Sequence, residues 1–289
     1  MCEFCTEHSE GRKWYLEMRN YSAELLNARL TGRELELAGT ETRLGWVQRF
    51  WRAFVLPAAG LKIKPEEWES QVETNDPAAR LANAQAVHFG QVIPMKDVEA
   101  VLDLGTSITR IPCGCRYLTT GQTNARYCFG LGLDQWGVMG KYPDTSASLE
   151  TLDREEAKRV IRRFDEDGLV HSVWTGMTPF VVGLCNCDRD CGAYKFYIEK
   201  RGRPSFFRAE YVCAVDPDRC TGCKSCMKQC QFGAQFFSHR QSKVYIDPTR
   251  CFGCGVCMAA CPSDAVKLIP RRKHPKAKDI WLAPPGPGT

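Results

Sequence analysis

An apolar stripe at helical spacing is the most regular pattern in the N-terminal part of the chain. Its members fall at positions i, i+3, i+7, i+10 and i+11, so they share one face of a helix that Pro57 ends. They are Leu44, Val47, Trp51, Phe54 and Val55. Basic residues on the other side leave two interpretations, a helix on a membrane surface or one that faces the core or another subunit. We expect the second, because most amphipathic helices are packing elements.

The middle of the chain mixes helical and strand patterns. Pro94 opens a helix that Gly105 closes, and Asp153 caps another helix, with Glu156 reaching back in a capping box. The predicted helices cover 78–88, 95–104 and 154–167, and the predicted strands cover 107–112, 169–174 and 180–184. The patterns predict an α+β fold with an N-terminal helical segment and a mixed α/β middle unit.

Composition divides the chain into four regions. They are a helical region 1–78, a mixed α/β unit 79–207, a cysteine-repeat unit 208–270 and a basic, Pro/Gly-rich tail 271–289, whose end at 284–289 we expect to be mobile.

The number of cysteines is unusual in an otherwise ordinary globular composition. Hydrophobic residues make up 44% and charged residues 25%, but there are 17 cysteines in tight clusters. There is no initial apolar signal segment and no stretch near the ~20 apolar residues that span a bilayer, so we expect a cytoplasmic chain without a membrane span. Because reducing compartments disfavour structural disulfides, the cysteines indicate metal binding or catalytic thiols.

The C-terminal unit contains an internal cysteine repeat. In each half, three cysteines are separated by two residues and a fourth follows after three more. The halves are Cys220, Cys223, Cys226, Cys230 and Cys251, Cys254, Cys257, Cys261. Three thiolates at this spacing can hold three irons of a cubane, and the fourth iron needs a distant ligand. Zinc is the alternative, but CxxC pairs suffice for zinc, so the triplets favour iron–sulfur clusters.

This repeat resembles the bacterial two-cluster [4Fe-4S] ferredoxin, which makes 208–270 a ferredoxin-like domain. The resemblance implies two [4Fe-4S] clusters, strands at 211–216 and 243–247, and a crossed ligation in which the last cysteine of each run binds the other cluster. The implied ligand sets are Cys220, Cys223, Cys226 and Cys261, and Cys251, Cys254, Cys257 and Cys230. One departure is Gln231, which follows Cys230 where the family has proline. We expect altered local geometry there without loss of a ligand.

The net charge does not identify a nucleic-acid-binding protein. A formal charge of +5 suggests nucleic-acid or membrane partners, but it counts every cysteine as neutral. Two oxidised clusters with their thiolates would each contribute about −2 and leave about +1. A local basic bias remains in the tail, at Arg271, Arg272, Lys273, Lys276 and Lys278.

Further cysteines follow predicted strands of the middle unit. A Cys-x-Cys-Arg motif follows the strand at 107–112 and a Cys-Asn-Cys motif follows the strand at 180–184, so adjacent strands of one sheet could bring both to one edge. We expect a third iron–sulfur cluster or metal site there, with packing as small buried hydrophobes as the competing interpretation. Its candidate ligands are Cys113, Cys115, Cys185, Cys187 and Cys191, with Cys128 as an alternative. Cys128 and Cys213 are isolated in the sequence, which favours packing for both.

The middle stretch is also similar to uncharacterised ferredoxin-fused proteins of anaerobes. The similarity rests on Cys-x-Cys-Arg and on the run Gly-Leu-Val-His at 168–171 ahead of Cys-Asn-Cys, and it names no activity. We interpret His171 as a structural histidine. Cys2, Cys5 and His8 have ligand-like spacing, and two interpretations stay open for them, completion of a metal site or free thiols without a partner.

The sequence contains no dinucleotide fingerprint, phosphate-binding loop or radical-initiating cysteine motif. Three functions are consistent with the features described above. The first is an electron-transfer protein or subunit that passes single electrons to or from a larger redox enzyme or an electron-donor protein. The alternative is a catalytic reductase that uses the third metal site. The last is a redox-responsive binding protein, which we rank lowest because the helix at 154–167 carries many acidic residues.

Overall fold

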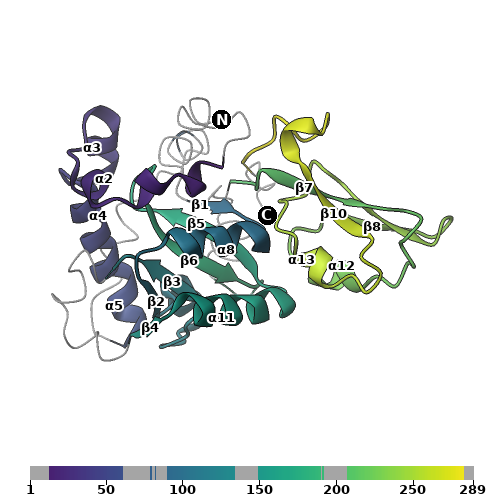
Figure 1. The fold of residues 1–289 in the computed structure, drawn as a ribbon, viewed down its shortest axis with the longest axis horizontal. Helices are drawn as coiled ribbons and strands as arrows, with labels where there is room; N and C mark the ends of the chain where they lie inside the picture. Colours follow the sequence, from purple (N-terminus) through teal and green to yellow (C-terminus); the bar gives the residue numbers. More distant parts are fainter. Residues whose placement is uncertain are drawn as a thin grey trace.

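The computed structural model describes residues 13–60, 79, 82, 90–133, 149–189, 191 and 207–282. Figure 1 shows N-terminal helices on one side of a six-stranded sheet and a C-terminal unit of two small sheets on the other. Helices combine with antiparallel sheets, which confirms the α+β class. None of the described helices is long and apolar enough to cross a membrane.

The N-terminal helices pack around the predicted amphipathic helix. Val47, Trp51 and Val55 are buried in a cluster with Phe180 of the sheet unit, so the core-facing interpretation is confirmed. The helix continues one residue past Pro57, because a π-helical turn shifts its hydrogen bonding and accommodates a proline in the last turn. The elements are η1 (Trp14–Leu16), η2 (Met18–Tyr21), α2 (Ala23–Asn27), α3 (Gly32–Ala38), α4 (Arg43–Phe50), the π-helical η3 (Trp51–Val55) and α5 (Leu56–Ala58).

The middle unit contains one antiparallel sheet with the strand order β1-β5-β6-β3-β2-β4. The strands are β1 (Gly90–Val92), β2 (Ile108–Ile111), β3 (Cys128–Leu131), β4 (Glu150–Leu152), β5 (Val170–Thr175) and β6 (Val181–Cys187). Its helices are α8 (Met95–Leu104), α9 (Gly114–Thr120) and α11 (Arg154–Glu166). The predicted helices at 95–104 and 154–167 are therefore confirmed, whereas the one at 78–88 lies outside the described residues except at positions 79 and 82.

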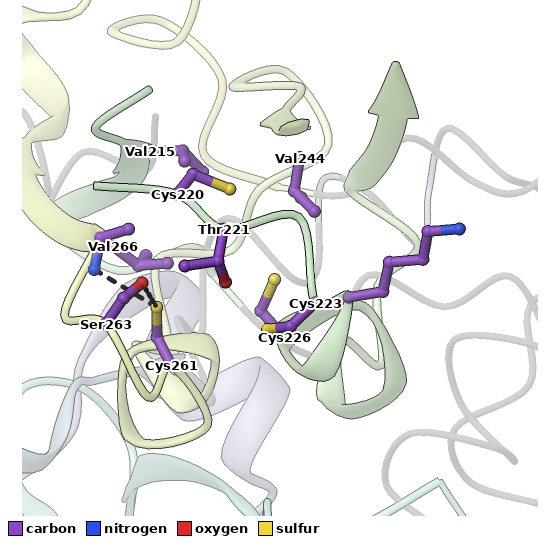
Figure 2. Close-up of a pocket in the computed structure, with 11 residues that line it drawn as sticks. Val215, Cys220, Thr221, Cys223, Cys226, Val244, Cys261, Ser263 and Val266 are labelled. Atoms are coloured by element: carbon purple, nitrogen blue, oxygen red, sulfur yellow. Dashed lines mark hydrogen bonds between the residues drawn. The ribbon is translucent and has the colours of Figure 1, made fainter. Parts of the chain in front are cut away.

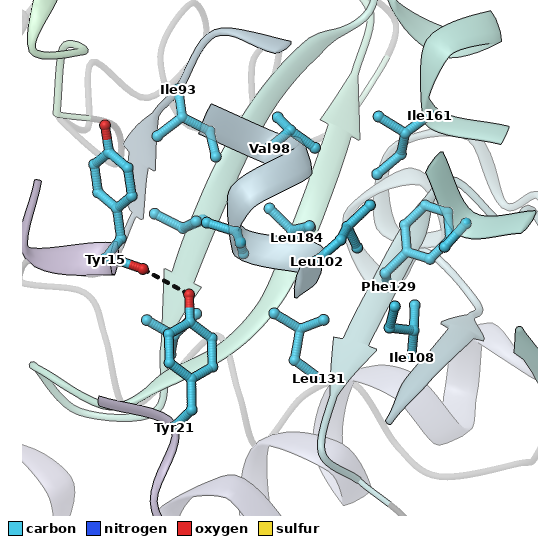
Figure 3. Packing of buried hydrophobic residues seen from close by; sticks show 14 of the residues in the cluster. Tyr15, Tyr21, Ile93, Val98, Leu102, Ile108, Phe129, Leu131, Ile161 and Leu184 are labelled. Atoms are coloured by element: carbon cyan, nitrogen blue, oxygen red, sulfur yellow. Dashed lines mark hydrogen bonds between the residues drawn. The ribbon is translucent and has the colours of Figure 1, made fainter. Parts of the chain in front are cut away.

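The main hydrophobic core lies between this sheet and the helices α8 and α11 (Figure 3). Val98 of α8 and Ile161 of α11 pack there with Leu184 of β6. Trp14 and Tyr15 of the N-terminal region are buried in the same core. The segment that contains η1 is thus packed into the core of the sheet unit, whereas the later N-terminal helices pack with Phe180 and Val182 in a second cluster.

Helix α11 begins at the predicted N-cap, and its C-terminal end lies next to the C-terminal unit. The Asp153 side chain accepts a hydrogen bond from the backbone N–H of Glu156 at 2.8 Å. At the other end Gly168 has a φ of +84°, and a Cβ there would lie 2.0 Å from Oε1 of Gln229. The left-handed backbone favours glycine at this position, whereas the Gln229 amide ends a flexible side chain that could move to admit a Cβ.

The C-terminal unit has two two-stranded antiparallel sheets and two short helices. β7 pairs with β10, and β8 pairs with β9. The elements are β7 (Tyr211–Val215), α12 (Ser225–Gln229), β8 (Gln235–Ser238), β9 (Lys243–Ile246), α13 (Val256–Ala259), β10 (Val266–Pro270) and η6 (Arg271–Lys273). The strands expected near 211–216 and 243–247 are confirmed as β7 and β9.

Residues 271–282 of the basic tail pack against the C-terminal unit. Arg271 is fully buried, Ala277 and Trp281 are buried, and Leu282 forms a β-bridge with Phe207. Arg271 donates to the carbonyl oxygens of Ala209 and Tyr211, so it satisfies buried backbone acceptors on the β7 side of the unit. The end at 284–289, where we expect mobility, lies outside the described residues.

Candidate metal centres

Thiols from both cysteine runs line one pocket of the C-terminal unit (Figure 2). The first run contributes three thiols from the loop after β7 and the start of α12, and the second contributes one from the turn after α13. We call them thiol group A: Cys220, Cys223, Cys226 and Cys261. Because Cys223 is exposed, group A lies at the surface. The pocket brings together the four cysteines of one crossed ligand set.

The remaining four ferredoxin-type cysteines lie deeper. The thiols of Cys254 and Cys257 interact electrostatically with that of Cys230, which belongs to the other run. Burial raises the pKa of the Cys254 thiol well above its usual range. We call the set thiol group B: Cys230, Cys251, Cys254 and Cys257. A buried thiol with a raised pKa stays protonated when it has no partner. The positively charged core of an iron–sulfur cluster would stabilise the thiolate form.

Backbone N–H groups point at sulfurs in both groups. The amide of Ala234 donates to Sγ of Cys230 at 3.4 Å, and the amide of Ala265 donates to Sγ of Cys261 at 3.3 Å. The two donors occupy the same place in the two halves of the repeat, four residues after the crossing cysteine. Such N–H···S bonds stabilise a thiolate and raise the reduction potential of a cluster bound to it.

Equivalent glycines shape the two cysteine loops. Gly222 and Gly253 both have a φ of +74°. A Cβ at Gly222 would lie 2.2 Å from the carbonyl oxygen of Ser242, and one at Gly253 would lie 2.0 Å from that of Tyr211. Glycine is therefore needed for the left-handed turn and for close approach to a neighbouring backbone.

Two buried arginines lie beside group B, and the sequence analysis did not single out either for this role. Arg271 donates from Nη2 to the carbonyl oxygen of Cys251 at 2.9 Å. Arg208 lies over the ring of Phe252, next in the chain to that cysteine. Burial lowers the pKa of Arg208 to about 10, so its guanidinium remains charged at neutral pH. Both place positive charge where an anionic cluster would be bound.

Gln231, the departure from the ferredoxin pattern, joins the two units. Its buried side chain donates from Nε2 to the carbonyl oxygen of Cys187 at 2.9 Å and to that of Gly168 at 3.0 Å. A proline could make neither bond. The exposed Arg189 adds a bond from Nη2 to the carbonyl oxygen of Cys230 at 2.6 Å. The glutamine that stands in place of the proline therefore connects the C-terminal unit to the sheet unit through hydrogen bonds.

We predict that Gln231→Leu weakens this junction. The substitution keeps a buried side chain of similar size but leaves two carbonyl oxygens without their donor, so the free energy of unfolding should fall by about 2 to 4 kcal/mol. Chemical denaturation of the anaerobic protein measures the change. Gln241→Leu, at an exposed turn position, is the matched control and should change stability by less than about 0.5 kcal/mol. Equal stability of the two variants would show that Gln231 does not hold the units together.

Six thiols gather at one end of the large sheet. The sulfur of Cys128, at the start of β3, lies 3.3 Å from that of Cys113 and 3.4 Å from that of Cys185. The sulfurs of Cys187 and Cys191 lie 3.4 Å apart. We call the set the middle thiol group: Cys113, Cys115, Cys128, Cys185, Cys187 and Cys191. All five cysteines predicted for a third site belong to it, together with the alternative ligand.

The antiparallel sheet explains this convergence. The end of β2, the start of β3 and the end of β6 lie at the same end of the sheet. The expectation that the strands before the two cysteine motifs are adjacent is wrong, because β3 lies between them and contributes Cys128. Cys185 and Cys187 alternate with Leu184, which packs under α8 and α11, so the two thiols lie on the opposite face.

Two cysteines thought to be isolated have sulfur neighbours. Cys128 lies between two thiols of the middle group, as described above. The backbone N–H of Cys213 on β7 donates to Sγ of Cys251 in group B at 3.3 Å, and its thiol interacts electrostatically with those of Cys254 and Cys257. Sequence spacing gave no signal for either, since the neighbours come from distant parts of the chain.

The histidine and the N-terminal residues singled out in the sequence have different outcomes. His171 is fully buried and its Nδ1 lies 2.6 Å from Oδ1 of Asn186, which agrees with a structural role. Its Nε2 lies 3.5 Å from Oδ1 of Asp165. Cys2, Cys5 and His8 lie outside the described residues.

In the described part of the chain, no group of three or more His, Cys, Asp or Glu side chains is arranged to hold a metal ion.

Comparison with known proteins identifies part of the chain. Residues 219–265 match the family model described as a 4Fe-4S dicluster domain. The match includes groups A and B and none of the middle thiol group. No curated protein and no solved structure matches the chain. The C-terminal part of this protein therefore contains an iron–sulfur domain of the ferredoxin type.

Proposed function

We propose that the protein transfers single electrons between a donor protein and a larger redox enzyme, using two [4Fe-4S] clusters held by groups A and B. Iron–sulfur clusters supply reversible one-electron redox chemistry at these positions. The chain supplies the thiolate ligands, N–H donors to the sulfurs, and the buried charges of Arg208 and Arg271.

The pocket of group A is the observation that carries this proposal. It is lined by Cys220, Cys223, Cys226 and the distant Cys261, which is the combination expected from crossed ligation. Zinc binding by CxxC pairs would not need a cysteine from the other run.

Burial gives the two groups different roles. Cys223 of group A is exposed, whereas Cys251 and Cys257 of group B are buried. Electron transfer to a partner requires a short distance to the protein surface, so we propose that the partner docks near group A. Group B faces the sheet unit, since Cys254 packs in a hydrophobic cluster with Val170 and Trp174 of β5.

Redox titration of the anaerobic full-length protein tests the function. With one-electron mediators, the electron paramagnetic resonance signals of groups A and B should appear and disappear reversibly. Cys223→Ser should change one signal and Cys254→Ser the other. Iron that cannot be reversibly reduced, or replacement of iron by zinc in freshly isolated protein, would contradict electron transfer.

The middle thiol group favours the catalytic reductase as a second candidate. An enzyme needs an iron with an open ligand position, and a centre held by three of these thiols would have one. A spectral change of that centre on addition of a small substrate would favour catalysis over electron transfer.

A further inference from the structure

The middle thiol group lies outside the ferredoxin-type cysteine repeat, and the family model does not reach it. We propose that this group binds a third iron–sulfur cluster through four of its six cysteines. The proposal does not depend on the ligation of groups A and B.

Convergence from separate segments is the first argument. Cys113 and Cys115 come from the junction of β2 and α9, and Cys128 from β3. Cys185 and Cys187 come from β6, and Cys191 follows that strand. The thiol of Cys115 interacts electrostatically with those of Cys113 and Cys191, which connects the two sets of sulfur contacts. Packing alone needs apolar volume, which Ala, Val or Leu provides, and gives no reason for sulfur to occupy all six positions.

Donor chemistry is the second argument. Six sulfurs without a nitrogen or oxygen donor form a soft site, which selects iron–sulfur clusters, zinc or Cu(I) over hard cations. Groups A and B, which belong to a 4Fe-4S dicluster domain, are likewise made of cysteine thiols alone, so the same donor chemistry supports a cluster here.

Compensating charge and N–H donors are the third argument. The backbone N–H of Tyr127 donates to Sγ of Cys113 at 3.1 Å. The Arg116 side chain is buried, pairs with Asp188 at 2.9 Å and lies 4.5 Å from the centre of the Tyr127 ring. The Arg116 guanidinium interacts electrostatically with the thiols of Cys113 and Cys191, while Asp188 offsets part of its charge. A cluster with four thiolates is anionic and is stabilised by such a charge.

The position of the group also connects it with group B. The Gln231 side chain donates to the carbonyl oxygen of Cys187, and Cys230 of group B precedes Gln231 in the chain. One hydrogen bond and a short piece of backbone thus separate a ligand of group B from a thiol of the middle group. A cluster at the middle group would extend the line of redox centres from the surface at group A into the sheet unit.

The triple variant Cys128→Ser, Cys185→Ser, Cys187→Ser tests the proposal in the full-length protein. It leaves three thiols in the group, one fewer than a four-thiolate cluster requires. The wild-type protein, reconstituted anaerobically with iron and sulfide, should hold about twelve irons and the triple variant about eight. The reduced variant should retain the resonance signals of groups A and B.

Two controls separate this result from misfolding and from failure of the proposed function. Val101→Ala removes buried methyl groups from the core under α8, outside all three thiol groups, and should keep the full iron content. Cys223→Ser should change group A while the signal absent from the triple variant persists. If the triple variant does not fold, iron and sulfide analysis of the wild-type protein still distinguishes three clusters from two.

Three results would overturn the proposal. One is a wild-type content of about eight irons that is unchanged in a folded triple variant. Another is one zinc ion lost from the triple variant while the iron stays constant. The last is a set of disulfides among these cysteines in protein isolated without oxygen, shown by mass spectrometry after alkylation.

Discussion

The Cys230→Ser variant is expected to change the cluster at group B, although Cys230 belongs to the cysteine run that supplies most of group A. Its sulfur interacts with Cys254 and Cys257 of the other run. Replacement of a thiolate by a hydroxyl weakens one iron–ligand bond, so iron should fall by up to about four atoms per chain. Electron paramagnetic resonance of the reduced protein measures which cluster changes.

Two reference variants show how the spectrum changes when group A or group B alone loses a ligand. Cys223→Ser and Cys254→Ser each remove the middle ligand of one run. The spectrum of Cys230→Ser should resemble that of Cys254→Ser, and Cys261→Ser should resemble Cys223→Ser. The opposite resemblance would mean that each run binds its own cluster without crossing.

Loss of the Arg271 side chain is expected to have the largest effect on stability. The guanidinium is fully buried and donates to the carbonyl oxygens of Ala209, Tyr211 and Cys251 at 2.7 to 2.9 Å. Arg271→Met fills much of the same volume without any donor, so the free energy of unfolding should fall by about 3 kcal/mol or more. Denaturant titration of the anaerobic protein measures this change.

The same variant should also alter the redox behaviour of group B. Reduction adds a negative charge to a cluster, which a nearby positive charge favours. Removal of the Arg271 charge should therefore lower the reduction potential at group B, by an amount on the order of 50 mV. Lys273→Met, at an exposed residue two positions further on, is the control and should change neither quantity appreciably. A normal potential in a folded Arg271→Met protein would contradict the electrostatic role.

Local sequence patterns predicted the elements with strong periodicity or capping. Asp153 and Glu156 begin α11 as expected, and the apolar stripe around Trp51 is buried. These features depend on neighbours within a few residues, which the sequence displays directly. The spacing of the cysteine repeat likewise indicated the thiols that the structure gathers in groups A and B.

Features that depend on strand order were not accessible in the same way. Nothing near Cys128 in the sequence shows that β3 inserts between β2 and β6, so its place in the middle thiol group follows only from the topology. At Gln231 the sequence predicts only a weakened turn, because its acceptors at Gly168 and Cys187 come from the sheet unit. The sequence places Arg271 in a basic tail, because charge alone does not reveal which backbone carbonyls need a donor.

The hydrophobic cluster between the sheet and the C-terminal unit bears on the modularity of the protein. Phe252 and Val256 pack there with Val92, Val170 and Trp174 of the sheet. A fragment consisting of residues 208–270 alone would expose this apolar surface to solvent and would also lack Arg271. The iron–sulfur domain therefore shares part of its hydrophobic packing with the sheet unit. If it were fused to another protein, that protein would have to supply a surface that replaces strands β1 and β5.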